Sequence, residues 1–580
     1  MMLHGFHTIA STFAAILLVD GVLAIENDKN AFGRTTDSPL TMMVKIFAND
    51  ATDDEVVFYQ RVFFTALVAL WTIIPMISYW KRRIKLTNGG APFLGTQPEG
   101  ISWPFLGQAL NYLKYRPWDL MMKWHRSHGP IFGFELFGSM FVSVASPSLL
   151  KQVLQSKIAS VKKDVANTMK HFLVILGTGI VTSEDDSWMK QRLKLSMPLR
   201  RDVLEWIPTQ TLIAVQRLCE TSLEKSCDDG SAIPMGSSLR HLTLQVISAT
   251  FLSLSAEESD SNFAKLYLPI VDESNARVWH PYRAYCFFMP FFWKHLWNGY
   301  NLNVYVSNLI RKRWQERRAA KVPEIHDILD RLLHVYETEF PGEEILPESA
   351  VKQFRDEMKT FMLAGHETSA AMMTWTLYEL MGNDELRQEV LDEAKAVFPA
   401  TKKENDDSVL HTDNLSKLAL SEACLKESLR KYSVVPIVAR RTINDLTLTE
   451  EAGNGETRNY FVPKGCSVMI NIQAIHMDPT LWPNPTKFDP QRFLTGKPLE
   501  PFTFVPFIAG PRNCLGQHLA LLESKMVISL LLKKYKFSLP KGKVIQVHDW
   551  KFGDNDSDPR HRYIIPVIPK EELMVHVSRR

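Results

Sequence analysis

The spacing of apolar and polar residues divides the chain into a long helical middle with strand-like segments on both sides. After Pro130 apolar and polar residues alternate (IFGFELFGSMFVSV), which predicts a β-hairpin. Apolar residues recur at helical spacing from about 147 to 435 and again over 515–534, while short strand-like runs broken by prolines occupy 436–513. A strand-like tail follows the last helix. We therefore predict an α+β fold that is mostly helical, with small β-sheets at one side.

Two apolar stretches precede the predicted hairpin. Residues 62–80 contain no charged side chain and run directly into the basic segment KRRIK, a pattern typical of a transmembrane helix whose cytosolic end lies at the cations. Residues 8–25 are interrupted by Asp20, so residues 1–25 are predicted to be either a cleaved signal peptide or a first transmembrane segment.

Charged and turn-forming residues around the second stretch predict the remaining organisation. Residues 26–61 carry seven acids and four bases, and we expect them on the lumenal side because basic flanks stay in the cytosol. Residues 81–107 form a basic hinge rich in proline and glycine. Residues 108–580 are then expected to form one large cytosolic domain.

The composition is that of an ordinary globular protein. The 580 residues include 45% hydrophobic and 23% charged side chains, which argues against wholesale disorder. The net charge of +3 gives no reason to expect nucleic acid as a partner. Six cysteines are spread widely without a CxxC pair, so we expect free thiols in a reducing compartment for all but Cys514.

Cys514 stands apart because of its neighbours in the segment PFIAGPRNCLG. Gly510 and Gly516 allow a tight backbone with amides free to face an anion, Arg512 adds a cation, and a helix is predicted to begin just after the cysteine. The pattern indicates a stabilised thiolate at a loop-to-helix junction. A catalytic cysteine would need a histidine base, and a zinc site at Cys514 and His518 would need a further Cys/His pair, which the sequence does not supply.

This segment matches a known signature at every defined position. FxxGxRxCxG is the haem-binding signature of the cytochrome P-450 superfamily, and residues 95–580 resemble that superfamily; the matching residues are Phe507, Gly510, Arg512, Cys514 and Gly516. The resemblance implies a cytochrome P-450 fold over 108–580, preceded by the membrane anchor. It also implies haem b as cofactor, with the Cys514 thiolate as axial ligand of the iron.

A glutamate–arginine pair in KESLR extends the resemblance. Glu427 and Arg430 lie one helical turn apart, which by itself would indicate only an ordinary surface pair. In the family this pair bonds to a third arginine, which corresponds here to Arg492 in FDPQRF, where Gln491 replaces the usual glutamate. Met477, in AIHMDPTLWPNP, likewise replaces a common arginine. The resemblance implies a structural triad beneath the haem.

The segment MLAGHETSA lies in a long apolar helix predicted over 347–381. One interpretation is a helix kinked at Gly365, with the Thr368 hydroxyl bonded back to a carbonyl. The other, implied by the family's [AG]GxxT motif, is a groove in which oxygen binds over the haem and Thr368, preceded by Glu367, relays protons. His366 is interpreted as a variable position and not a ligand.

Three further residues are implied to contact the haem propionates. Trp188 and Arg192 in SWMKQRLKL match the family pattern WxxxR, which has only two defined positions and is therefore weak by itself. Arg440 occupies a propionate-binding position ten residues beyond Arg430, although Arg441 beside it is an alternative.

Two segments indicate what the protein contacts. Ten of the 22 residues of 279–300 are Phe, Trp or Tyr, so this segment is core, a loop dipping into a membrane, or the roof of a channel for an apolar substrate. The basic run Lys190–Arg201 corresponds to the surface where the family docks an NADPH-dependent reductase. The sequence carries no nucleotide-binding fingerprint, so electrons are expected from that separate protein.

The resemblance implies a monooxygenase of the endoplasmic-reticulum membrane with a cytosolic catalytic domain. It would insert one atom of O2 into a lipophile such as a fatty acid, sterol or carotenoid, and the best local matches are to microsomal fatty-acid and carotenoid hydroxylases. A haem-thiolate isomerase or dehydratase without a reductase is the alternative, which Glu367 and Thr368 argue against. A second alternative is a non-enzymatic membrane haem protein.

Overall fold

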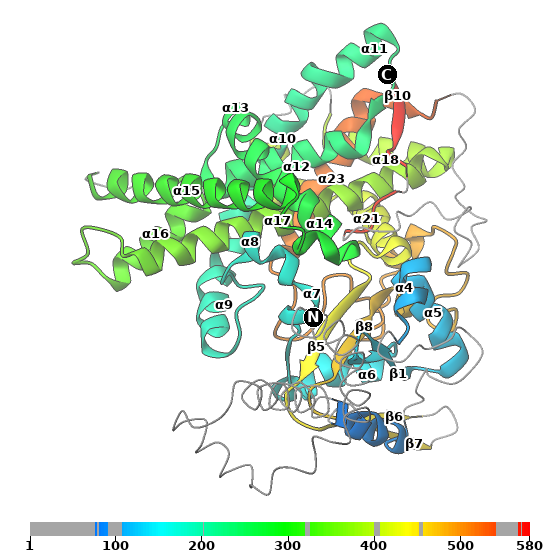
Figure 1. The fold of residues 1–580 in the computed structure, drawn as a ribbon. Helices are drawn as coiled ribbons and strands as arrows, with labels where there is room; N and C mark the ends of the chain where they lie inside the picture. Colours follow the sequence, from blue (N-terminus) through cyan, green and yellow to red (C-terminus); the bar gives the residue numbers. More distant parts are fainter. Residues whose placement is uncertain are drawn as a thin grey trace, which may run out of the picture. The chain divides into compact units, whose positions relative to one another are not determined.

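The computed structural model describes most of the chain beyond residue 75 (Figure 1). The described residues are 76–77, 80–90, 107–200, 202–319, 325–399, 407–451, 456–540, 566–569 and 571–580. The predicted segments 1–25, 26–61 and nearly all of 62–80 lie outside them. Among the described residues, no helix is both long enough and apolar enough to cross a bilayer.

The described residues form two compact units, whereas we had expected one domain over 108–580. Unit 1 takes its residues from 1–111, 131–143 and 442–468. Unit 2 takes them from 112–130, 144–441 and 469–580, and it contains every predicted site residue. The chain passes between the units several times, which a linear analysis of composition could not detect.

Unit 1 carries most of the predicted hairpin. Strands β1 (Ile131–Leu136) and β2 (Ser139–Val144) are joined through Phe137 and Gly138, whose φ angles of 48° and 70° are those of a tight two-residue turn. This confirms the hairpin prediction. A second antiparallel pair joins β6 (Leu446–Glu451) to β7 (Thr457–Val462).

Unit 2 is built around α17 (Glu348–Met381), which confirms the predicted long helix. It packs against α12 (Met235–Leu252), α21 (Ala419–Tyr432) and α23 (Gln517–Lys534). The helix runs without a break through Gly365. A Cβ at Gly365 would lie 2.6 Å from Cδ1 of Ile247 on α12, so the glycine serves the close approach of the two helices.

The aromatic segment 279–300 mostly faces outward. It spans the end of α14 (Ala264–Trp279), the turn η6 (Pro281–Ala284) and the start of α15 (Pro290–Ala319). Six of its rings are more than half exposed, and core packing is therefore wrong for these residues: Tyr282, Phe287, Phe288, Trp293, Trp297 and Tyr300.

Small sheets complete unit 2, as predicted for the tail and for part of 436–513. Strand β10 (Met574–Arg579) pairs antiparallel with both β4 (Ile233–Pro234) and β9 (Tyr535–Ser538). Strand β5 (Ile437–Thr442) lies beside β3 (Val161–Lys163) and β8 (Ser467–Asn471). The other helices in or bordering unit 2 are α4 (Ala109–Lys114), α5 (Pro117–His128), α6 (Pro147–Lys151), α7 (Val165–Thr168), α8 (Leu173–Leu176), α9 (Asp185–Arg200), α10 (Asp202–Leu218), α11 (Glu224–Asp229), α13 (Ala256–Glu258), α16 (Ile328–Glu339), α18 (Asp384–Val397), α19 (Asp407–Leu410), α20 (Thr412–Leu415) and α22 (Ile472–His476).

Candidate cofactor site

The loop that carries Cys514 is held in a tight turn just before α23. The Cys514 amide donates to the Phe507 carbonyl at 2.8 Å, and the Asn513 amide donates to the Gly510 carbonyl at 3.2 Å. Gly510 has a φ of +77°, and a Cβ there would lie 2.3 Å from the carbonyl oxygen of Leu154. Only glycine fits this position, for reasons of both conformation and space.

The Cys514 side chain is accessible although it lies among packed protein atoms. Burial raises the pKa of its thiol, whereas a hydrogen bond from the Gly516 amide and the charge of Arg192 lower it. A sulfur that is accessible and yet desolvated indicates an enclosed space. The net effect raises the pKa, so the polypeptide alone favours the thiol, and the charge of a bound metal would favour the thiolate.

We expected Arg512 to be the cation that stabilises the Cys514 thiolate, but Arg512 pairs with Glu184 instead. Its Nη1 and Nη2 lie 2.8 Å and 2.5 Å from the two carboxylate oxygens of Glu184, and its guanidinium lies 5.0 Å from the ring centre of Trp188. The cation that acts on Cys514 is Arg192, whose Nη1 donates at 2.8 Å to the Asn513 carbonyl.

Lys163, Arg440 and Arg512 form what we call the cation cluster, with Glu184 as the acid common to all three. Burial lowers the pKa of Lys163 to about 7; the charges of Arg512 and Arg440 lower it further, and those of Glu184 and Glu357 oppose the shift. Burial and Arg512 lower the pKa of Arg440 to about 10, and its buried Nε has no hydrogen-bond partner among the described residues. The cluster therefore carries positive charge that the described residues do not balance.

Sequence reasoning had identified Arg440 and Arg512 but missed Lys163. Its Nζ donates to the carbonyls of Ile180 at 2.6 Å and Ser183 at 2.8 Å, and it lies 5.9 Å from the ring centre of Trp188. The only local signal was a lysine in a short β-like run, which is common on protein surfaces.

One stretch of α17 faces open space in the middle of an otherwise buried helix. Ala364 is exposed, and Gly365 and Thr368 are half-buried, with buried residues on both sides of this stretch. The Thr368 hydroxyl donates to the Ala364 carbonyl at 2.6 Å. The structure therefore contains the back-bonded threonine, while the oxygen-binding groove stays a prediction.

Glu367 points away from this stretch into a buried ion network. It pairs with Arg240, and its Oε1 lies 3.2 Å from Nε2 of His366. Burial alone would raise the pKa of Glu367, but His366 and Arg240 outweigh it and lower the pKa to about 2. Arg240 also lies 3.4 Å from the carboxylate of Asp272 on α14. Glu367 is thus a carboxylate at neutral pH.

This network was not found from the sequence. Arg240 lies 127 positions before Glu367, so no local pattern links them. His366, expected to be variable and without a role, is fully buried and lies 3.4 Å from the Tyr267 hydroxyl.

The structure brings Glu427, Arg430 and Arg492 together. Arg430 donates from Nε and Nη2 to the two oxygens of Glu427 at 2.8 Å and 2.6 Å, and Nε of Arg492 lies 3.4 Å from the same carboxylate. Arg430 also donates to the carbonyls of His476 at 2.9 Å and Lys487 at 3.2 Å. Both members of the central pair are fully buried.

These features fit a haem better than a metal bound by side chains alone. An accessible sulfur can ligate the iron, and an uncompensated cation cluster can receive the two propionates. His518 is exposed, and the described part of the chain holds no group of three or more His, Cys, Asp or Glu side chains placed to bind a metal ion. The zinc alternative therefore receives no support from these residues.

Comparisons with known proteins also indicate a haem protein. The chain is 28% identical over 456 residues to cytochrome P-450 4c21 of Blattella germanica, which covers 76% of this chain and 87% of that one. It is 25% identical over 420 residues to an ultra-long-chain fatty acid omega-hydroxylase of Homo sapiens, covering 69% and 75%.

A solved haem domain, that of cytochrome P-450DA, shares the fold with a TM-score of 0.65 at 20% identity, over 84% of this chain and 98% of that one. The family model for cytochrome P-450 matches residues 98–555. The chain therefore belongs to the cytochrome P-450 family and is a monooxygenase.

Proposed function

We propose that this monooxygenase hydroxylates fatty acids with electrons from an NADPH-dependent reductase, and that it holds haem b through Cys514. The accessible Cys514 sulfur close to an unbalanced cation cluster is the observation that supports the haem site. The omega-hydroxylase among the relatives and the apolar surroundings of α17 support the substrate class. Sterols and carotenoids are the other candidate lipophiles.

We assign the haem contacts to residues that surround the accessible sulfur. Haem iron, when bound, activates O2 for insertion into a C–H bond. Cys514 would hold the iron, with Phe507, Gly510 and Gly516 shaping its loop. Trp188, Arg192 and the cation cluster would hold the propionates, and the triad Glu427–Arg430–Arg492 would fix the loops nearby.

Thr368 is proposed to deliver protons from the open stretch of α17. Its hydroxyl donates to the Ala364 carbonyl and would be free to rotate toward the open side of the helix. Glu367 is held as a carboxylate by Arg240 and His366, so its part in proton delivery would be to keep this charged network in place beside Thr368. Arg240 links Glu367 to Asp272, whose side chain is 65% exposed, and this gives the network an end in solvent.

Thr368→Ala should uncouple the reaction. NADPH consumption should continue while product falls by about 10²-fold or more and hydrogen peroxide rises, because positioned proton transfer contributes about 10²–10⁴-fold. Thr374→Ala is the matched control, since Thr374 makes the same back-bond to Ala370 at 2.7 Å on a buried face of α17. Equal coupling in both variants would show that the back-bond alone explains Thr368.

The reductase is proposed to dock on α9. Lys190 and Lys194 are exposed on this helix, and the two apolar side chains beside them, Met189 and Leu193, are 50% and 68% exposed. Exposed cations around an apolar centre suit an acidic protein partner.

Membrane attachment is proposed for residues 62–80 and for the outer face of α15. Trp293, Leu296, Trp297 and Tyr300 form an exposed stripe on one side of that helix, and aromatic rings of this kind favour the bilayer interface. We propose an endoplasmic-reticulum location with a cytosolic catalytic domain. Protease added to intact microsomes should then digest residues 108–580, whereas protection until detergent is added would contradict this orientation.

The direct test is turnover by the full-length haem protein with an NADPH-dependent reductase. Fatty acids, sterols and carotenoids would be supplied in parallel, and products identified by mass spectrometry. A fatty acid should gain one oxygen atom from ¹⁸O2 only when reductase and NADPH are present. Conversion without reductase, or no label in the product, would favour an isomerase or dehydratase instead.

A further inference from the structure

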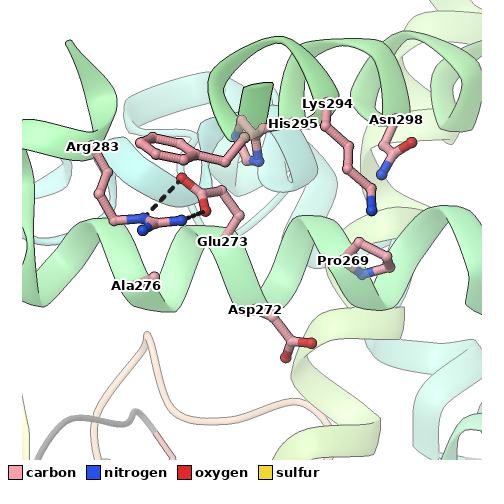
Figure 2. A pocket seen from close by; sticks show the side chains of 9 residues that line it. Pro269, Asp272, Glu273, Ala276, Arg283, Lys294, His295 and Asn298 are labelled. Atoms are coloured by element: carbon pink, nitrogen blue, oxygen red, sulfur yellow. Dashed lines mark hydrogen bonds and ion pairs between the residues drawn. The ribbon is translucent and has the colours of Figure 1, made fainter. Parts of the chain in front are cut away.

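A polar pocket lies between α14 and α15, away from Cys514 (Figure 2). Its volume is about 420 Å³, within the range of small-molecule sites. Polar side chains come from both helices and from the turn η6 between them: Asp272, Glu273, Arg283, Lys294, His295 and Asn298.

The acids of this pocket already have partners. Glu273 accepts from Nε of Arg277 at 2.9 Å and from Nη2 of Arg283 at 2.6 Å, the latter contact being visible in Figure 2. Asp272 pairs with Arg240 at 3.4 Å. The pocket therefore has little acceptor capacity left for a cationic ligand.

Hydrogen-bond donors of this pocket, in contrast, lack acceptors among the described residues. His295 is 2% exposed, and neither of its ring nitrogens has a hydrogen-bond partner among the described residues. Asn298, which is also buried, lines the pocket beside it. Lys294 is exposed at the rim and makes no ion pair with any described residue. Buried donors without acceptors are uncommon in folded proteins, and an anionic oxygen would satisfy them.

The rest of the wall is apolar. Pro269, Ala276 and the ring of Phe291 line the cavity, and Arg283 lies 4.0 Å from that ring's centre. A site with spare donors at one side and apolar carbon at the other suits an amphiphile with an anionic head.

We propose that this pocket binds the carboxylate of a fatty acid, with Lys294 and His295 beside the carboxylate oxygens. The choice of a fatty acid rests on the proposed function. The head belongs either to the substrate, reaching toward α17, or to a second fatty-acid molecule. The ion pairs Asp272–Arg240–Glu367 already link this pocket to the segment that carries Thr368.

The test is calorimetric titration of the full-length haem protein with dodecanoate and with its methyl ester. Wild type should bind the acid at least about tenfold more tightly than the ester. Lys294→Glu and His295→Leu should each remove about tenfold of the affinity for the acid and leave the ester unchanged. Lys265→Glu, the same charge change at an exposed site of α14 outside the pocket, should bind both as wild type does.

An unchanged affinity of Lys294→Glu for dodecanoate would overturn the proposal. Because Lys294 is exposed, this variant should fold even if His295→Leu does not. An azole that occupies the haem site separates the two sources of the carboxylate. Binding that depends on Lys294 and persists with the azole identifies a second molecule, and loss of that binding identifies the substrate's own head. Failure of fatty-acid turnover with Lys294-dependent binding intact would refute only the proposed function.

Discussion

Two arginine-rich regions of unit 2 differ in how their charge is balanced. In the triad, Glu427 receives both Arg430 and Arg492, and backbone carbonyls take the remaining N–H groups of Arg430. In the cation cluster, Lys163, Arg440 and Arg512 share the carboxylate of Glu184, and Lys163 is also influenced by Glu357, whose own pKa is raised by burial to about 7. The central pair Glu427–Arg430 is complete without a ligand, whereas the three cations of the cluster outnumber the acids around them.

The pKa values of two cluster residues reflect burial and the repulsion among its cations. Burial and mutual repulsion lower the pKa of Lys163 to about 7 and that of Arg440 to about 10. A region built only for stability would not keep three cations this close with two acids among them, one of which has a pKa raised to about 7. The difference supports our proposal that the triad locks the fold and that the cluster would hold the propionates.

The largest expected effect comes from opening the triad. Glu427→Ala leaves Arg430 as an uncompensated buried charge, which should lower the free energy of unfolding by about 3–5 kcal/mol. Urea denaturation of the haem protein measures it. Glu422→Ala is the control, because Glu422 also pairs with two cations, Lys426 at 2.8 Å and Lys525 at 2.9 Å, but is partly exposed. A similar loss of unfolding free energy in both variants would mean that the triad stabilises the fold no more than a partly exposed ion pair does.

Arg440→Leu should weaken haem binding without lowering the free energy of unfolding, the reverse of the effect expected for Glu427→Ala. Replacing one cation of an unbalanced cluster by an apolar side chain should leave the free energy of unfolding of the apoprotein unchanged or raise it by about 1 kcal/mol. Haem affinity should fall about tenfold, or about 1.4 kcal/mol, because one propionate contact is lost. Haem transfer to an acceptor protein measures the second quantity. An apoprotein as destabilised as Glu427→Ala would mean that the two regions are alike.

The smallest effect is a pH dependence caused by Lys163. Its pKa of about 7 in the folded protein lies below the usual value of about 10.4, so between these pH values the unfolded chain binds more protons. The free energy of unfolding of the apoprotein should therefore rise with pH from 7 to 9. Lys163→Met should lose this part of the slope, while other titrating groups cancel in the difference between the two proteins. Equal slopes would contradict the assigned pKa.

The sequence predicted well those features that depend on local spacing. The helix over α17, the hairpin after Pro130 and the helix after Cys514 all follow from periodicity and turn residues. Glu427, Arg430 and Arg492 were brought together in advance only through the family resemblance, because nothing in FDPQRF by itself points to KESLR.

Long-range partners could not be predicted. Arg512 turns to Glu184 and away from the sulfur, and Arg240 reaches Glu367 from a different helix. Charge attraction is not sequence-local, so each of these cations had many candidate acids. Lys163 was missed for the same reason, since its role depends on Arg440 and Arg512 lying close by in the fold.

The central claim is that Cys514 is the axial ligand of a haem whose propionates rest on the cation cluster. The most direct measurement is the absorption spectrum of the reduced protein with carbon monoxide. Wild type should show the red-shifted Soret band of a thiolate ligand, Cys514→Ala should lose it, and Cys227→Ala, a substitution at another partly accessible thiol, should keep it. A Cys514→Ala protein that retains the red-shifted band would contradict the assignment and place the ligand at another cysteine.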